Sequence, residues 1–193
     1  MIIDNFTFKE DVGVFSGDKN YTQNAIDMLY EIKKLNSKSD GSSNVNGWQK
    51  EINNNVNFSH IKTMILKEFV EYFQKCVGNY NMDVSVIKFF ANINSNGAYH
   101  TMHYHEGGQY SGAYWLQGDE DSGNIIIMNP LPNMFINTFS SRMSENNNYN
   151  CIQIIPKSNT GVFFNSNLIH YVDVNRSKKD RIGLGFHLLL KDK

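Results

Sequence analysis

Several residues and features that mark particular protein classes are scarce in this sequence. Its 193 residues include two cysteines, Cys76 and Cys151, which predicts reduced thiols in a cytoplasm rather than a disulfide framework. The net charge of −1 provides no basic surplus for binding nucleic acid or an anionic membrane. No apolar run approaches the roughly 20 residues that span a bilayer. The first residues lack the basic-then-apolar order of a secretory signal.

The composition that remains is that of a globular chain with a real core. Hydrophobic residues make up 40% of it, and its length suits a single domain over residues 1–193. Its 27 asparagines and 15 lysines stand against 3 arginines and 3 prolines, a bias typical of low-GC coding. We therefore expect a protein of the cytoplasm of a bacterium or of a phage-infected host cell. An asparagine is weak evidence in such a chain, whereas an arginine is informative.

Residues 1–83 are expected to form a helical support region. Apolar residues recur at helical spacing over residues 21–36, and again from Ser59 to the stop signal at Gly78. The intervening residues 37–57 are rich in Ser, Asn, Gly and Lys and are expected to form a connecting loop that carries Trp48. Neither helix carries a chemical motif, so both are interpreted as packing on the outside of something else.

Residues 84–193 change to short apolar segments between turn signals. Without helices between them, such segments predict an antiparallel sandwich or jelly roll. The long polar loop 131–149 is expected to be functional or disordered. The predicted strands are 84–94, 98–105, 110–117, 124–129, 150–156, 161–165, 169–174 and 181–190.

Histidines carry the chemistry of this half. His100, His103 and His105 fall within six residues. On an extended strand His103 and His105 point to the same face, with Cα atoms about 6–7 Å apart. Neutral imidazole is a common ligand for Fe, Zn, Cu or Ni, and two such ligands with a distant third leave positions open for substrate and dioxygen. The alternatives are surface histidines on a strand, or Glu106 supplying a carboxylate ligand after local bending.

The third ligand has to come from elsewhere in the chain. His60 lies in a predicted helix and His187 near the C-terminus, while His170 follows a turn and an apolar run. Arg181 comes eleven residues after His170 and opens the last predicted strand. A co-substrate with two carboxylates needs a fixed cation at one end, and arginine offers a bidentate fork that lysine cannot reproduce. Arg176, in the preceding turn, is the competing candidate, and an ordinary surface arginine is the simpler alternative.

Three segments together resemble the 2-oxoglutarate/Fe(II)-dependent oxygenases, in particular a small bacterial and phage group related to the prolyl hydroxylases. The segments are NINSNGAYHTMHYHEGGQYSGAYWL, SGNIIIMNP and GVFFNSNLIHYVDVNRSKKDRIGLGFHL, within residues 84–190. The resemblance implies a mainly β fold, a double-stranded β-helix (a cupin-like jelly roll) with two helices packed on one side. It also implies that iron is held by His103, His170 and His105, the last at the position of a carboxylate in many relatives.

The same resemblance assigns a co-substrate site and an activity. Arg181 would bind the distal carboxylate of 2-oxoglutarate, and Trp115 falls where relatives have a tyrosine. Ser111 and Trp115 would share the inward face of their strand, and Asn92 could face the co-substrate. The implied reaction is hydroxylation of a C–H bond in an amino-acid side chain, of a peptide or protein, or in a small molecule, with release of succinate and CO2 and with ascorbate in support.

Departures from the family pattern keep other functions open. Gly183 stands where relatives have a serine two residues after the arginine, which removes a hydroxyl from the co-substrate site. Gly97 followed by His103 and His105 matches the opening of a cupin motif, although the glutamate expected next is absent. The alternatives are therefore a cupin-type metalloenzyme that does not use 2-oxoglutarate and a non-catalytic jelly roll.

Overall fold

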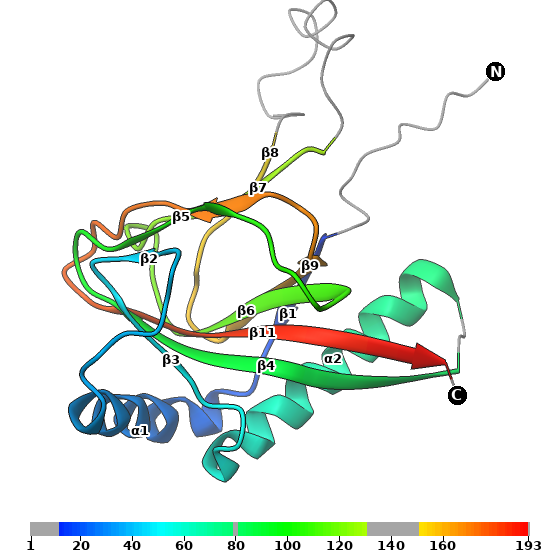
Figure 1. The fold of residues 1–193 in the computed structure, drawn as a ribbon, viewed down its shortest axis with the longest axis horizontal. Coiled ribbons are helices and arrows are strands. Elements are labelled where there is room, and N and C mark those ends of the chain that lie inside the picture. The colour runs from blue at the N-terminus through cyan, green and yellow to red at the C-terminus, as the bar shows by residue number, and fades with distance from the viewer. Residues whose placement is uncertain (1–11, 79–80, 131–150, 193) are drawn as a thin grey trace, which may run out of the picture.

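Two β-sheets face each other and two helices cover one of them (Figure 1). The computed structural model describes residues 12–78, 81–130 and 151–192. The elements are β1 (Val12–Ser16), α1 (Thr22–Leu35), β2 (Asn44–Val45), β3 (Trp48–Glu51), α2 (Ser59–Val77), β4 (Met82–Asn94), β5 (Tyr99–His103), β6 (Tyr110–Gln117), β7 (Ile125–Met128), β8 (Cys151–Ile154), β9 (Thr160–Asn165), β10 (His170–Val172) and β11 (Arg181–Asp192).

Every strand pairing described is antiparallel. The larger sheet has the order β1-β9-β6-β11-β4-β3, and the smaller has the order β2-β5-β10-β7-β8. Strands that are distant in sequence therefore alternate in space, and β11 is held on both sides, by β4 and by β6. From β4 to β11 the strands follow one another with no helix between them among the described residues, as the turn signals predicted. The mainly β jelly-roll class is confirmed.

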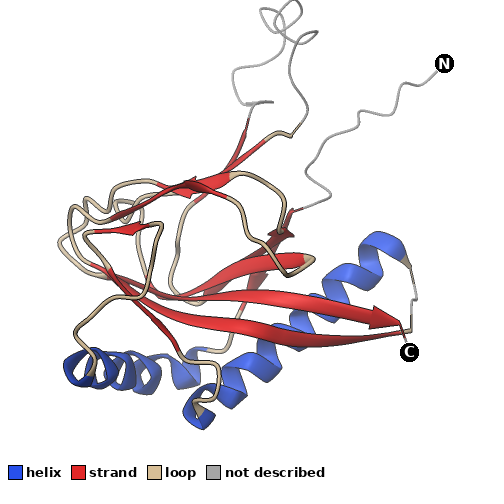
Figure 2. Cartoon of the chain, viewed as in Figure 1, coloured by secondary structure: helices blue, strands red, loops and turns tan. Residues whose placement is uncertain are grey.

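Both helices lie on the outer face of the larger sheet (Figure 2). The buried face of α1 includes Ile26 and Leu29, and that of α2 includes Ile65 and Phe69, in one cluster with Phe89 of β4. Burying an Ile, Leu or Phe side chain contributes about 1.5–3 kcal/mol, so this face holds the helices to the sheet. The structure thus confirms two helices on one side of the sheets.

The N-terminal half is less purely helical than the sequence pattern indicated. Strands β1, β2 and β3 join the sheets, and β2 and β3 lie in the segment 37–57 that was expected to be a loop. The reason is tertiary: Trp48 is buried in the helix-side core, and its Nε1 donates to the carbonyl of Asn36. The predicted functional loop 131–149 lies outside the described residues. Among the described helices, none is both long and apolar enough to cross a membrane.

Candidate metal and co-substrate site

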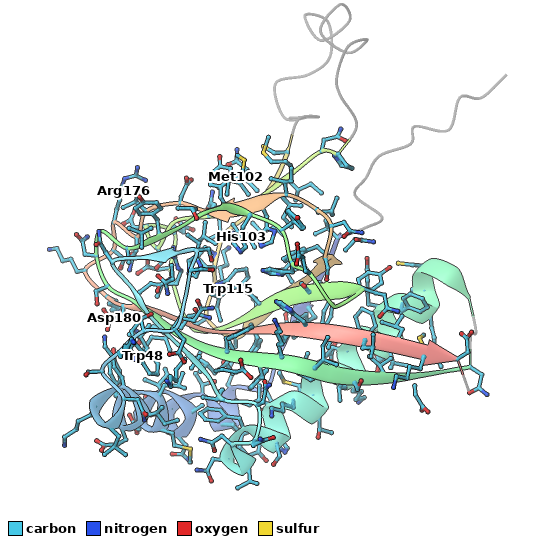
Figure 3. All side chains as sticks on the ribbon, viewed as in Figure 1. Trp48, Met102, His103, Trp115, Arg176 and Asp180 are labelled. Carbon is cyan, nitrogen blue, oxygen red and sulfur yellow. The ribbon has the colours of Figure 1, made fainter. Side chains whose placement is uncertain are left out.

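Three of the predicted site residues converge between the two sheets. His103 ends β5 and pairs in register with His170 at the start of β10, and His105 follows two residues later. One ring nitrogen from each histidine lies within 4.8 Å of the others. Figure 3 shows His103 in the space between the sheets. The convergence of His103 and His105 agrees with the prediction, but its cause differs from the expected strand alternation: β5 ends at His103, and the backbone N–H of His105, just beyond the strand, donates to the carbonyl of Ser166.

Two of these rings are held in the form that binds a metal. The Nδ1 of His103 lies 2.6 Å from the carbonyl oxygen of Thr101, and that of His170 lies 2.9 Å from the carbonyl oxygen of Leu168. A carbonyl can only accept, so each Nδ1 donates and each Nε2 keeps its lone pair. A ligating histidine usually has its other nitrogen held in this way, so the donor set fits a divalent transition metal.

Burial keeps these rings neutral near pH 7. It lowers the pKa of His170 to about 4 and that of His105 to about 2, because a charged ring loses hydration inside the cavity. The Nδ1 of His105 is buried and has no hydrogen-bond partner among the described residues. Neutral imidazole is the form in which histidine coordinates metals, so the electrostatics of the cluster agree with its geometry.

Glu106, the alternative to His105 as the middle ligand, does not join the cluster. Its side chain is exposed and accepts a hydrogen bond from the hydroxyl of Tyr104 at 3.2 Å. Within the described part of the chain, the only group of potential metal ligands consists of the three histidines. His60 is also outside it, and its ring packs against that of Tyr21 in a tilted contact.

Arg181 lines the same cavity as the three histidines, while Arg176 does not. The Arg181 side chain is 3% exposed, and its Nη1 donates to the carbonyl oxygens of Asp173, at 3.0 Å, and Ser122. None of the described carboxylates forms an ion pair with it. Burial lowers the pKa of Arg181 to about 10, so the guanidinium stays charged at pH 7. Arg176 is exposed and lies at the edge of the molecule in Figure 3.

Asn94 and His100 lie beside the guanidinium of Arg181, and neither was predicted from the sequence to contact it. With the Asn94 amide oriented to satisfy its neighbours, its Oδ1 accepts from Arg181 Nη2 at 3.1 Å and from His100 Nε2 at 2.8 Å. Burial, followed by the charge of Arg181, lowers the pKa of His100 to about 3. His100 was visible as part of the histidine group, but nothing distinguished Asn94 from the other 26 asparagines.

The remaining predicted residues divide into two sets. Trp115 and Asn92 line the cavity, and the Oδ1 of Asn92 is buried without a hydrogen-bond partner among the described residues. Ser111, on the same strand as Trp115, is buried but does not line the cavity. Its hydroxyl forms a hydrogen bond with that of Ser166 at 2.7 Å. Ser111 therefore fixes the start of the turn before His170.

One row of β11 forms the floor of this cavity, which has a volume of about 740 Å³. Arg181, Gly183, Gly185 and His187 alternate along that row. A Cβ at Gly183 would lie 3.2 Å from Cδ1 of Trp115, so glycine permits the indole to lie close to the floor. His187 is 6% exposed, and its ring centroid lies 4.2 Å from that of His105. No motif in the sequence had marked His187 as a site residue.

Comparison with known proteins relates this geometry to a family. Residues 88–187, just over half of the chain, match the model of the family described as "Putative 2OG-Fe(II) oxygenase". No curated protein sequence matches the chain.

Solved structures share the fold at low sequence identity. A prolyl-4-hydroxylase from Pseudomonas putida has a TM-score of 0.64 and 8% identity, over 95% of this chain and 93% of its own. A prolyl hydroxylase from Trichoplax adhaerens, in complex with a hypoxia inducible factor peptide fragment, has a TM-score of 0.63 and 14% identity, over 92% and 84%. The nogalamycin-biosynthesis epimerase SnoN, in complex with Fe3+, alpha ketoglutarate and nogalamycin RO, has a TM-score of 0.66 and 8% identity, over 94% and 80%.

These likenesses confirm the double-stranded β-helix that the sequence resemblance implied. The family match extends over the strands that carry both the histidine cluster and Arg181. The chain therefore belongs to the 2OG-Fe(II) oxygenase family, enzymes that use Fe(II) as cofactor and 2-oxoglutarate as co-substrate.

Proposed function

We propose that this oxygenase hydroxylates a C–H bond of an amino-acid side chain, in a peptide or protein, or of a small molecule. One oxygen atom of dioxygen enters the substrate, the other enters succinate, and 2-oxoglutarate loses CO2. His103, His105 and His170 hold the metal, and Arg181 binds the distal carboxylate of 2-oxoglutarate. The observation that carries the proposal is that a buried arginine, which forms no ion pair with a described carboxylate and has only the longer-range attraction of Asp173, lines the same cavity as a three-histidine cluster.

The unpaired charge of Arg181 is the strongest argument for an anionic ligand. A buried cation is costly unless it is paired and hydrogen-bonded. The carbonyls of Asp173 and Ser122 occupy Nη1 but bring no negative charge. A carboxylate beside the other N–H donors would complete the site with charge-assisted hydrogen bonds. The indole Nε1 of Trp115 is a further donor in the cavity, and the amide of Asn92 lies on the neighbouring strand.

The chain's own residues act by holding and orienting the reactants. Fe(II), when bound, supplies the redox chemistry that activates dioxygen, and ascorbate supports it by keeping the metal reduced. If Fe(II) were bound, His103, His105 and His170 would hold it through neutral ring nitrogens, and three protein ligands would leave room for the chelating end of 2-oxoglutarate. Gly183 and Gly185 keep the floor between Arg181 and the cluster free of side chains. Apolar walls that include Phe164 and Ile125 limit the access of water.

The substrate class rests on the cavity and on the structural neighbours. A volume of about 740 Å³ has room for a second reactant besides 2-oxoglutarate. The neighbours include a prolyl hydroxylase in complex with a peptide fragment and an epimerase in complex with nogalamycin RO, which supports both substrate kinds. The two cysteines, which are not joined in a disulfide, support a cytoplasmic location.

Two measurements test this proposal. Metal analysis of the purified protein should find one metal ion per chain in the wild type and none in His170→Ala. Titration of 2-oxoglutarate into the anaerobic Fe(II) protein should then give saturable binding. A metal-free wild type that cannot be loaded would favour a non-catalytic jelly roll. A metal-bound protein that ignores millimolar 2-oxoglutarate would favour a cupin-type enzyme.

A further inference from the structure

His105 differs from the other two histidines of the cluster in how it is held. His103 and His170 lie on paired strands, and each is anchored through Nδ1 to a backbone carbonyl two residues earlier. His105 follows the end of β5 in an irregular segment, where its backbone N–H donates to the carbonyl of Ser166 at 2.9 Å. Its own Nδ1 has no partner among the described residues. With Nε2 as the ligating nitrogen of His105, as Nδ1 anchoring makes it in His103 and His170, the hydrogen bond that normally fixes the rotation of a ligating ring is missing here.

An aromatic ring supports His105 in place of that hydrogen bond. The His187 ring stacks on it with a centroid distance of 4.2 Å and an angle of 26° between the planes. Phe164 is more distant, at 6.2 Å and 33°. His187 lies outside the group whose nitrogens converge, so it is a neighbour of the cluster and not one of its members.

The position of His187 in the fold makes it a rigid support. It lies on β11, where the backbone is paired with Lys88 of β4 and Ser111 of β6. Its ring also meets the ring of Phe90 edge-on, at 5.6 Å. The Nδ1 of His187 is also buried without a partner among the described residues, so its placement comes from the pairing of its backbone with two strands and from the contact with Phe90. A ring placed by a strand that is paired on both sides can support a ring on a less regular segment.

We infer that His187 is a positioning residue that fixes the metal ligand His105 by ring stacking, in place of the missing Nδ1 hydrogen bond. The inference rests on the proposed metal site and adds a residue to it. It assigns the role to the flat face of the ring and not to the nitrogens of His187. Removing an interaction that orients a metal ligand typically costs 10- to 100-fold in metal affinity.

The test compares side chains of similar bulk but different shape at position 187. Co(II) affinity is measured by titration of the metal-free protein, together with the Co(II) absorption spectrum and the melting temperature. His187→Phe keeps a stacking ring and should bind Co(II) within about threefold of the wild type, with the same spectrum. His187→Leu fills the site without a ring, and it should lose roughly 10- to 100-fold in affinity with an altered spectrum. His60→Leu is the control, since it removes another histidine, on α2 and away from the cluster, whose ring packs on that of Tyr21 in a tilted contact, and it should change nothing.

Two results would overturn the inference. His187→Leu binding Co(II) like the wild type would mean that stacking does not orient His105. His187→Phe losing as much affinity as His187→Leu would mean that a ring nitrogen of His187, and not its face, does the work. A failure of the proposed metal site looks different, because the wild type itself would then not bind Co(II).

Discussion

Arg181→Ala is expected to weaken 2-oxoglutarate binding far more than metal binding. The variant leaves the distal carboxylate in a cavity without a cation, and the guanidinium that it removes is 3% exposed and thus poorly screened by water. Losing one side of a buried charge-assisted pair costs on the order of 2–5 kcal/mol. At about 1.4 kcal/mol for each factor of ten, this is roughly a 30- to 4000-fold loss of affinity.

Arg181→Lys should restore only part of that loss. An ammonium group supplies the charge but cannot donate two parallel hydrogen bonds to a carboxylate. It also cannot keep the Nη1 contacts to the carbonyls of Ser122 and Asp173 while reaching the co-substrate. We therefore expect the affinity of the lysine variant to lie between those of Arg181→Ala and the wild type.

The assay is calorimetric titration of 2-oxoglutarate into the anaerobic Fe(II)-loaded protein, with metal affinity measured separately. Because Arg181 also joins two loops through their carbonyls, each variant needs a thermal melt to show that it is folded. Arg176→Ala is the matched control: Arg176 is exposed and should leave 2-oxoglutarate affinity unchanged. Folded, metal-loaded Arg181→Ala with wild-type affinity would refute the assignment of the co-substrate site.

The other predictions concern the cluster and its surroundings. His103→Ala or His170→Ala should abolish metal binding in equilibrium dialysis, whereas Glu106→Gln should bind like the wild type because Glu106 lies outside the cluster. Trp115→Phe loses one N–H donor, so calorimetry should show about a tenfold loss of 2-oxoglutarate affinity with metal binding intact. Burial lowers the pKa of His100 from 6.5 to about 3. As the pH falls, His100 is therefore protonated in the unfolded chain before it is protonated in the folded one, which favours unfolding. The free energy of unfolding in urea should therefore decrease between pH 7.5 and 5. The decrease should be smaller in His100→Gln than in the wild type, by on the order of 2 kcal/mol.

The strands of the C-terminal half and the histidine pair could be predicted because both follow local rules. Turn residues delimit the strands from β4 to β11, and the two-residue spacing of His103 and His105 predicted that the two converge, although β5 ends at His103 and the strand period does not reach His105. Arg181 stood out because arginine is rare in a chain that is rich in lysine. In each case the signal lies within a few neighbouring residues.

What the sequence did not predict depends on contacts between distant segments. Strand β2 has two residues and β3 has four, too short to show a period, and both exist because they pair with β5 and β4. The approach of His187 to His105 depends on how β11 crosses the end of β5, and the contact of Asn94 with Arg181 depends on the register of β4 against β11. Neither the spacing nor the residue type marks these positions.

The central claim is that this protein couples iron to the breakdown of 2-oxoglutarate, and succinate release without a primary substrate tests it most directly. With Fe(II), ascorbate and oxygen, the wild type should slowly convert 2-oxoglutarate to equal amounts of succinate and CO2. His170→Ala should release none, and Arg176→Ala should match the wild type. Iron-loaded wild type that releases no succinate above the His170→Ala background, at millimolar 2-oxoglutarate, would contradict the account.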